Sequence, residues 1–198
     1  MNFQQLQDEV TGRGFDFQSS ARVGSWVNNA YTELCDLEDW PFLQASASGP
    51  APLTIADLGV VEGVRTQAGV RLMAIDRRQL EHDVTDLTTA GSPSCYYLTA
   101  GQTISTYPTS MASITVRYWK TPAEMVSTLA VPIIPARFHE LIVLGALRRA
   151  ALEESDGPDY ASFDAEWQRG VQIMRERVLL WHRDGNTSQV RSASHGDT

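Results

Sequence analysis

Residues 27–43 read VNNAYTELCDLEDWPFL, and this stretch decides how the first part of the chain folds. Together with the residues just before it, it places apolar side chains at steps of three and four: Val23, Trp26, Val27, Ala30, Tyr31, Leu34 and Leu37. That spacing predicts a helix over 20–38 with one face in a core. The helix should end at Trp40-Pro41, because the residue before a proline is pushed out of the α region.

Three further helices are predicted, over 2–11, 136–154 and 158–183. The middle of the helix over 136–154 reads LIVLGAL and is apolar on nearly every side, so neighbours from this chain or from other subunits should enclose it. The break SDGP at 155–158 implies that this helix and the next form an antiparallel hairpin.

Between about 43 and 131 the pattern changes to short runs rich in Val, Ile, Thr and Tyr, separated by turn-forming residues. The predicted strands are 52–56, 59–66, 69–75, 95–99, 102–107 and 112–119. Ala100-Gly101 is the candidate hairpin turn, and Asp76 is a candidate cap for a short helix that interrupts the strands. These runs predict a small antiparallel sheet or barrel.

The predicted fold class is therefore α+β. A mainly helical frame, made of two N-terminal helices and a C-terminal helical hairpin, surrounds the β insertion at about 43–131. We expect residues 1–184 to form a single domain. Residues 185–198 are too polar to order themselves by burial, and they are predicted to form an extended C-terminal arm.

Composition restricts the function classes. The 198 residues carry a formal net charge of -8. This charge argues against a protein that binds nucleic acid tightly, since such binding depends on Lys and Arg side chains that neutralise phosphates. An acidic channel wall would instead let DNA slide past without specific binding. No run is long enough for a membrane span, and the amino terminus lacks the features of a secretory signal, so synthesis in the cytoplasm is the simplest expectation.

No catalytic, metal or cofactor motif is recognisable. The four histidines, at 82, 139, 182 and 195, are scattered, and His139-Glu140 does not continue into HExxH. Phosphate-binding loops and nucleophile elbows are absent. Acidic residues at 36, 38 and 39 are expected to form a solvated helix end that needs a cationic partner, since carboxylates there oppose the helix dipole. We therefore predict no enzyme, no cofactor and no metal.

Arginines near the C-terminal hairpin allow two interpretations. Residues 148, 149, 169, 175 and 177 could form a basic band that docks an acidic partner surface. Alternatively they are helix-surface charge, balanced by Glu153, Glu154, Glu166 and Glu176. The candidate interface residues are Arg148, Arg149, Trp167, Arg175, Trp181 and Arg191.

Several ordered segments resemble the head-to-tail adaptor, or connector, proteins of tailed bacteriophages. The helix that ends in Trp-Pro (27–43) is similar to the opening helix of that family, and GSPSCYYLTAGQTISTYP (91–108) resembles its Gly-x-Pro-x-x-Tyr strand and the next strand, which ends in proline. VRYWKTPAEM (116–125) is similar to its exit strand. VPIIPARFHELIVLGALRRA (131–150) and FDAEWQRGVQIMRER (163–177) resemble its last two helices.

The resemblance implies a structural subunit of a ring, commonly of about twelve copies, that lies beneath the portal protein and provides the seat for the tail or the next connector protein. DNA would pass through the central channel, and the protein would be found in the virion. A head-closure or tail-terminator ring protein is the alternative, and a small enzyme with an unrecognised site is a weaker one. Loss of the arm at 185–198 is expected to weaken docking without unfolding the domain.

Overall fold

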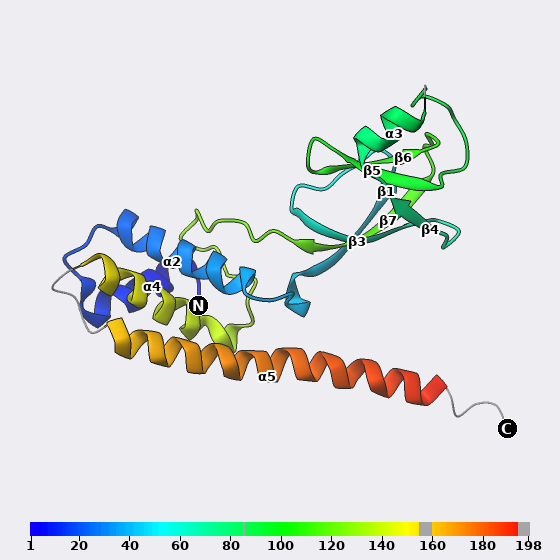
Figure 1. The fold of residues 1–198 in the computed structure, drawn as a ribbon. Helices are drawn as coiled ribbons and strands as arrows, with labels where there is room; N and C mark the ends of the chain where they lie inside the picture. Colours follow the sequence, from blue (N-terminus) through cyan, green and yellow to red (C-terminus); the bar gives the residue numbers. More distant parts are fainter. Residues whose placement is uncertain (85, 155–159, 194–198) are drawn as a thin grey trace. The chain divides into compact units, whose positions relative to one another are not determined.

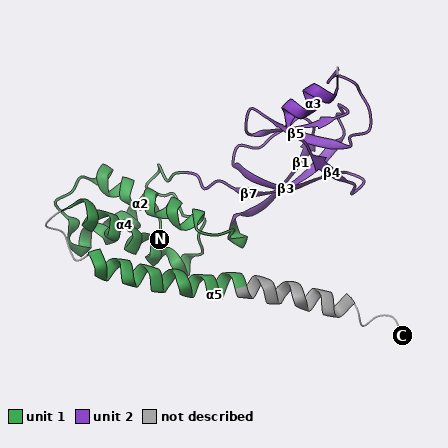
Figure 2. Cartoon of the chain, in the orientation of Figure 1, with its two compact units in different colours: residues 1–42, 124–198 green, residues 43–123 purple. Residues whose placement is uncertain are grey.

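The computed structural model describes residues 1–84, 86–154 and 160–193, with the backbone alone from residue 180 onward. The chain separates into two compact units (Figure 2). The helical unit consists of Met1–Phe42 and Glu124–Thr198, and the sheet unit consists of Leu43–Ala123. The architecture is α+β, as predicted.

In the part of the helical unit that the structure describes there are four α-helices (Figure 1). They are α1 (Phe3–Val10), α2 (Ser20–Asp36), α4 (His139–Glu153) and α5 (Tyr160–Ala193). Side-chain caps fix two of the starts: the Asn2 side chain accepts a hydrogen bond from the Gln5 backbone N–H, and Ser19 accepts one from Arg22. The helix α5 continues to Ala193 instead of ending at 183. The last part of the predicted arm, 194–198, lies outside the described residues.

The helix α4 is the centre of the helical unit and packs against α1, α2 and α5. Its fully buried side chains come from all around the helix and include Ile142, Val143, Ala146 and Leu147. The predicted enclosure is therefore supplied by this chain's own helices, and burial of α4 needs no other subunit. Gly145 allows α4 to approach α2 closely, because a Cβ there would lie 2.9 Å from the Cβ of Ala30.

The described residues of the sheet unit form seven strands and one short helix. These elements are β1 (Gln44–Pro50), β2 (Leu53–Thr54), β3 (Leu58–Thr66), β4 (Arg71–Ala74), α3 (Arg77–Asp83), β5 (Cys95–Thr99), β6 (Thr103–Tyr107) and β7 (Ser113–Lys120). The strand order is β1-β7-β3-β4-β5-β6-β2. The two outermost strands, β1 and β2, follow each other directly in the chain, so the sheet is nearly closed.

The sheet is mixed, whereas the sequence predicted an antiparallel one. All pairings between the strands are antiparallel except β4 with β5, where Met73 lies opposite Cys95 in a parallel register. The reason is the connection through α3, which carries the chain back so that β5 starts beside β4 in the same direction. Asp76 caps α3, as predicted, by accepting a hydrogen bond from the Arg78 backbone N–H.

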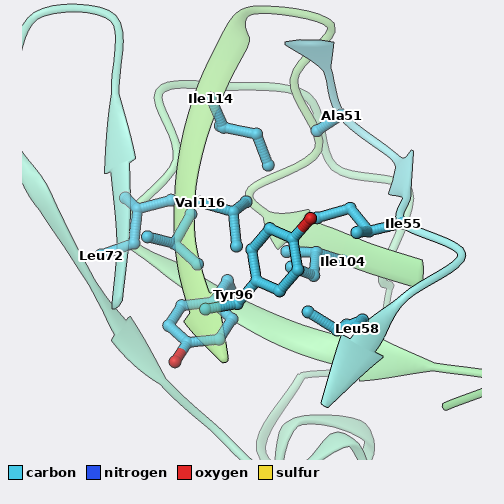
Figure 3. Close-up of a cluster of buried hydrophobic side chains, with 10 residues drawn as sticks. Ala51, Ile55, Leu58, Leu72, Tyr96, Ile104, Ile114 and Val116 are labelled. Carbon is cyan, nitrogen blue, oxygen red and sulfur yellow. The ribbon is translucent and has the colours of Figure 1, made fainter. Parts of the chain in front are cut away.

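The inner face of the sheet forms its own hydrophobic core (Figure 3). Side chains from β3, β4, β6 and β7 point toward one another there, and Val64, Ile104 and Val116 have no exposed surface. The predicted turn between β5 and β6 is present, with Ala100 at φ 51° and Gly101 at φ 75°. Positive φ at these two positions is what a tight hairpin requires.

Candidate interaction surfaces

A cluster of charged side chains joins three helices of the helical unit. Arg148 on α4 forms an ion pair with Glu33 on α2 and donates from Nη1 to Asp164 Oδ1 on α5 at 3.2 Å. The neighbouring Arg149 donates from Nη2 to the other Glu33 oxygen at 2.8 Å. Each guanidinium thus bonds across a helix boundary, and the cluster ties α2, α4 and α5 together.

Burial sets the electrostatics of this cluster. The side chain of Arg148 is only 13% exposed. Burial alone would raise the pKa of Glu33, but hydrogen bonds and charge from Arg148 and Arg149 hold that pKa below its ordinary value. Burial would likewise lower the pKa of Arg148, yet Glu33 and Asp164 raise it. Both partners are therefore charged at neutral pH.

The six predicted interface residues fall into three sets. Arg148, Arg149 and Trp167 meet in this cluster, with the Arg148 guanidinium carbon 4.1 Å from the Trp167 ring centroid. Trp181 and Arg191 lie outside the residues whose side chains the structure describes. The acidic partners that the sequence suggested are wrong for Arg148 and Arg149. Two of those suggested residues, Glu153 and Glu154, pair instead with Arg22.

Arg175, the remaining predicted residue, lies on α5 and pairs with Glu38. Its Nε is 2.9 Å from Glu38 Oε1, just beyond the C-terminal end of α2. This contact supplies the cationic partner that the acidic helix end was expected to need. Asp36 and Asp39, beside it, are exposed, and no ion pair is formed by either of them within the described part of the chain.

An exposed apolar segment lies in the helical unit, at residues 126–131. Val126 is 85% exposed and Leu129 is 75% exposed, and Val131 is also exposed. The backbone of the segment is nevertheless held, because the N–H groups of Phe3 and Gln4 donate to its carbonyls at the start of α1. A fixed backbone with several outward apolar side chains is typical of a protein contact. The sequence prediction missed it, although VSTLAV shows the apolar residues plainly.

The sheet unit has a hollow of about 600 Å³ between β3, β5 and the start of α3. Its charged residues already have local roles: Asp76 caps α3, and Arg77 bonds to Glu81 at 2.7 Å. In the described residues no group of three or more His, Cys, Asp or Glu side chains is arranged to hold a metal ion. No described helix combines the length and apolar character needed to cross a membrane. These features do not assemble a catalytic constellation around the hollow.

Comparison with known families gives the decisive observation. The family model of the SU10 adaptor protein matches residues 1–192, nearly the whole chain. The chain belongs to this phage adaptor family. No curated protein matches it. The whole sheet unit, the helical unit up to residue 192, and the charged cluster between α2, α4 and α5 fall inside the matched range.

Family membership identifies the adaptor as a bacteriophage structural protein. It confirms the resemblance recognised in the helix that ends at Trp40-Pro41 and in the segments after it. A structural adaptor also agrees with the expectation of a protein that is not an enzyme. The surfaces above are therefore the places where its contacts with other proteins should be sought.

Proposed function

We propose that this chain is a subunit of the head-to-tail adaptor ring of a tailed phage. Copies of the chain, about twelve, assemble beneath the portal protein and provide the attachment site for the tail or the next connector protein. The ring encloses a channel through which DNA passes without specific binding, and the chain has no catalytic role. Its location is the virion.

The observation that carries the proposal is the match of residues 1–192 to an adaptor family. Surface properties support it. A closed ring of identical subunits uses head-to-tail contacts, so each subunit must present two different contact surfaces. The helical unit offers the exposed apolar segment at 126–131, and the sheet unit exposes Val60 and Met73. Exposed apolar surfaces on two separate units fit that requirement.

Charge supports the proposed channel. Of the 24 acidic and 16 basic residues, six of each lie in the sheet unit, so the whole net charge of -8 belongs to the helical unit. A surface with this excess of carboxylates repels phosphates and does not hold a duplex in place. The proposal therefore places part of the helical unit where DNA travels.

A binding experiment with two targets and a control without either tests the proposed place in the virion. Purified chain is mixed with the portal protein of the same phage, with isolated tails, or with neither, and bound chain is measured after size separation. We expect binding to the portal with no other phage protein present. A head-closure protein would need a ring already seated on the portal, and a tail terminator would bind the tails. Either result would replace the adaptor proposal.

Removal of residues 185–198 tests the proposed role of the C-terminal arm in docking. The truncated chain should keep the thermal unfolding transition of the full chain, because α1, α2, α4 and both cores remain. Its affinity for the portal should fall. Equal portal binding by the truncated and full chains would remove the arm from the docking surface and leave the rest of the proposal standing.

A further inference from the structure

Three arginines gather on the outer face of the sheet unit. Val64, Leu72 and Val116 point into the core, so their neighbours Arg65, Arg71 and Arg117 point outward, and all three are exposed. Arg65 lies directly opposite Arg71, and Arg117 lies opposite Gly63. We call Arg65, Arg71 and Arg117 the arginine face.

The arginine face surrounds a shallow hollow of about 160 Å³ whose floor includes Gly63. A Cβ at Gly63 would lie 4.0 Å from Arg71 Nε, so the Arg71 side chain extends over the glycine. The hydroxyl-bearing Thr115 also lines the hollow. Several N–H donors around a small open floor provide a site for a carboxylate group of a partner.

Within the described residues, this face is only partly neutralised. One carboxylate, Glu62, lies 3.7 Å from Arg117 Nε, and Glu62 also accepts a hydrogen bond from Gln44 at 2.7 Å. Arg65 donates to the backbone oxygen of Gly69. Arg71 has no carboxylate partner in the described part of the chain. Two like charges directly opposite each other on a sheet are unfavourable until a counter-charge is supplied.

The helical unit presents the opposite charge. Asp36 and Asp39 are exposed at the C-terminal end of α2, where the helix dipole disfavours negative charge. Arg175 neutralises their neighbour Glu38. We call Asp36 and Asp39 the acidic corner. The sheet unit thus presents a local cluster of cations at the arginine face, and the helical unit presents exposed carboxylates at the acidic corner.

We infer that the arginine face binds the acidic corner of a neighbouring copy of the chain. This inference rests on the proposed ring and specifies one of its head-to-tail contacts, in which two different surfaces meet. A second copy fits better than nucleic acid, because Glu62 lies within the hollow and the whole net negative charge of the chain is on the helical unit. Opposite charges on two surfaces also set the orientation of the contact.

A concentration series of the full-length protein followed by nuclear magnetic resonance tests the inference without the portal. Between dilute solution and roughly 1 mM, amide signals of Gly63, Arg65 and Arg71 should shift together with those of Asp36 and Asp39. The shifts should disappear in about 0.5 M salt, because exposed charges are then screened within a few ångströms. Shifts confined to other surfaces, or no shifts at all, would overturn the inference.

Substitutions that reverse the charge on each surface give a second test of the inference. Arg71→Glu and Asp39→Arg should each weaken self-association by roughly fivefold, as expected for loss of exposed ion pairs, and the chain carrying both should recover it. Arg78→Glu is the matched control, because it makes the same charge change at another exposed arginine of the sheet unit. If Arg71→Glu associates like the wild type, the inference fails. Portal binding measured separately would still decide the proposed function.

Discussion

The guanidinium of Arg148 lies over the indole ring of Trp167, 4.1 Å from its centroid, and joins α4 to α5. The same guanidinium is paired with Glu33 on α2 and with Asp164. Cation–π contact and ion pairing therefore act on one side chain at the place where three helices meet. This residue is a structural junction of the helical unit.

Replacing Arg148 should cost more stability than replacing its neighbour. Arg148→Met leaves the carboxylates of Glu33 and Asp164 partly buried with less compensation, and we expect the free energy of unfolding to fall by about 2 kcal/mol. Arg149→Met is the matched control. Its side chain is 36% exposed, and the loss should stay below about 1 kcal/mol. Urea unfolding of both variants measures the difference, and equal losses would contradict the junction role.

Glu33 should make the unfolding free energy depend on pH in the acid range. Its pKa is lowered in the folded state by Arg148 and Arg149, despite burial, so the stability it contributes is present above its unfolded pKa of about 4.3 and is lost as the pH falls through the folded value. The stability gap between wild type and Glu33→Gln should therefore shrink below about pH 4. A gap that stays constant down to acid pH would show that Glu33 is not held as a carboxylate.

Because of His139, the folded chain should be more stable at neutral pH than at weakly acid pH. Burial lowers its pKa, and Nε2 lies 2.8 Å from the Ile134 carbonyl oxygen, to which it must donate. Nδ1 then accepts from the Met1 amino group at 2.7 Å. The unfolded chain binds the proton first, so stability should fall as the pH drops below about 6.5. Histidine signals followed by nuclear magnetic resonance should give His139 a pKa below the ordinary histidine value of about 6.5, and a pKa at or above that value would contradict the burial of a neutral ring.

Gly145 should tolerate no side chain. In Gly145→Ala the new Cβ would lie 2.9 Å from the Cβ of Ala30 and 3.1 Å from Trp167 Nε1, so α4 must move away from its neighbours. We expect a loss of about 1 to 3 kcal/mol, as for other overpacked cores. Gly12→Ala is the control, because nothing lies within 4 Å of its added Cβ. Thermal unfolding of the two variants measures this, and an unchanged Gly145→Ala would mean that the helices are packed less closely.

Local patterns were enough to predict the helices and several turns. The apolar spacing from Val23 to Leu34 gave the buried face of α2, and Asp76 marked the start of α3 by its side-chain cap. The hairpin at Ala100 and Gly101 follows from the glycine, which accepts positive φ at little cost. Each of these depends on interactions within a few residues, which a sequence pattern contains.

Features that depend on tertiary pairing were not predicted. The strand β1 reads QASASGP, in which only the small residues Ala45 and Ala47 alternate toward the core, and it pairs along its length with β7. The parallel pairing of Met73 with Cys95 depends on where the α3 connection returns. Glu33 could not be identified as the partner of Arg148, since they are far apart in sequence and meet only after α2 packs on α4. The exposure of Val126 and Leu129 likewise requires the folded chain.

Cryo-electron microscopy of the portal protein mixed with this chain tests the proposed adaptor ring. We predict a closed ring of the chain on one end of the portal, with a central opening and with density for both the helical and the sheet units in every subunit. Portal particles that remain bare while the chain stays free in solution would contradict it.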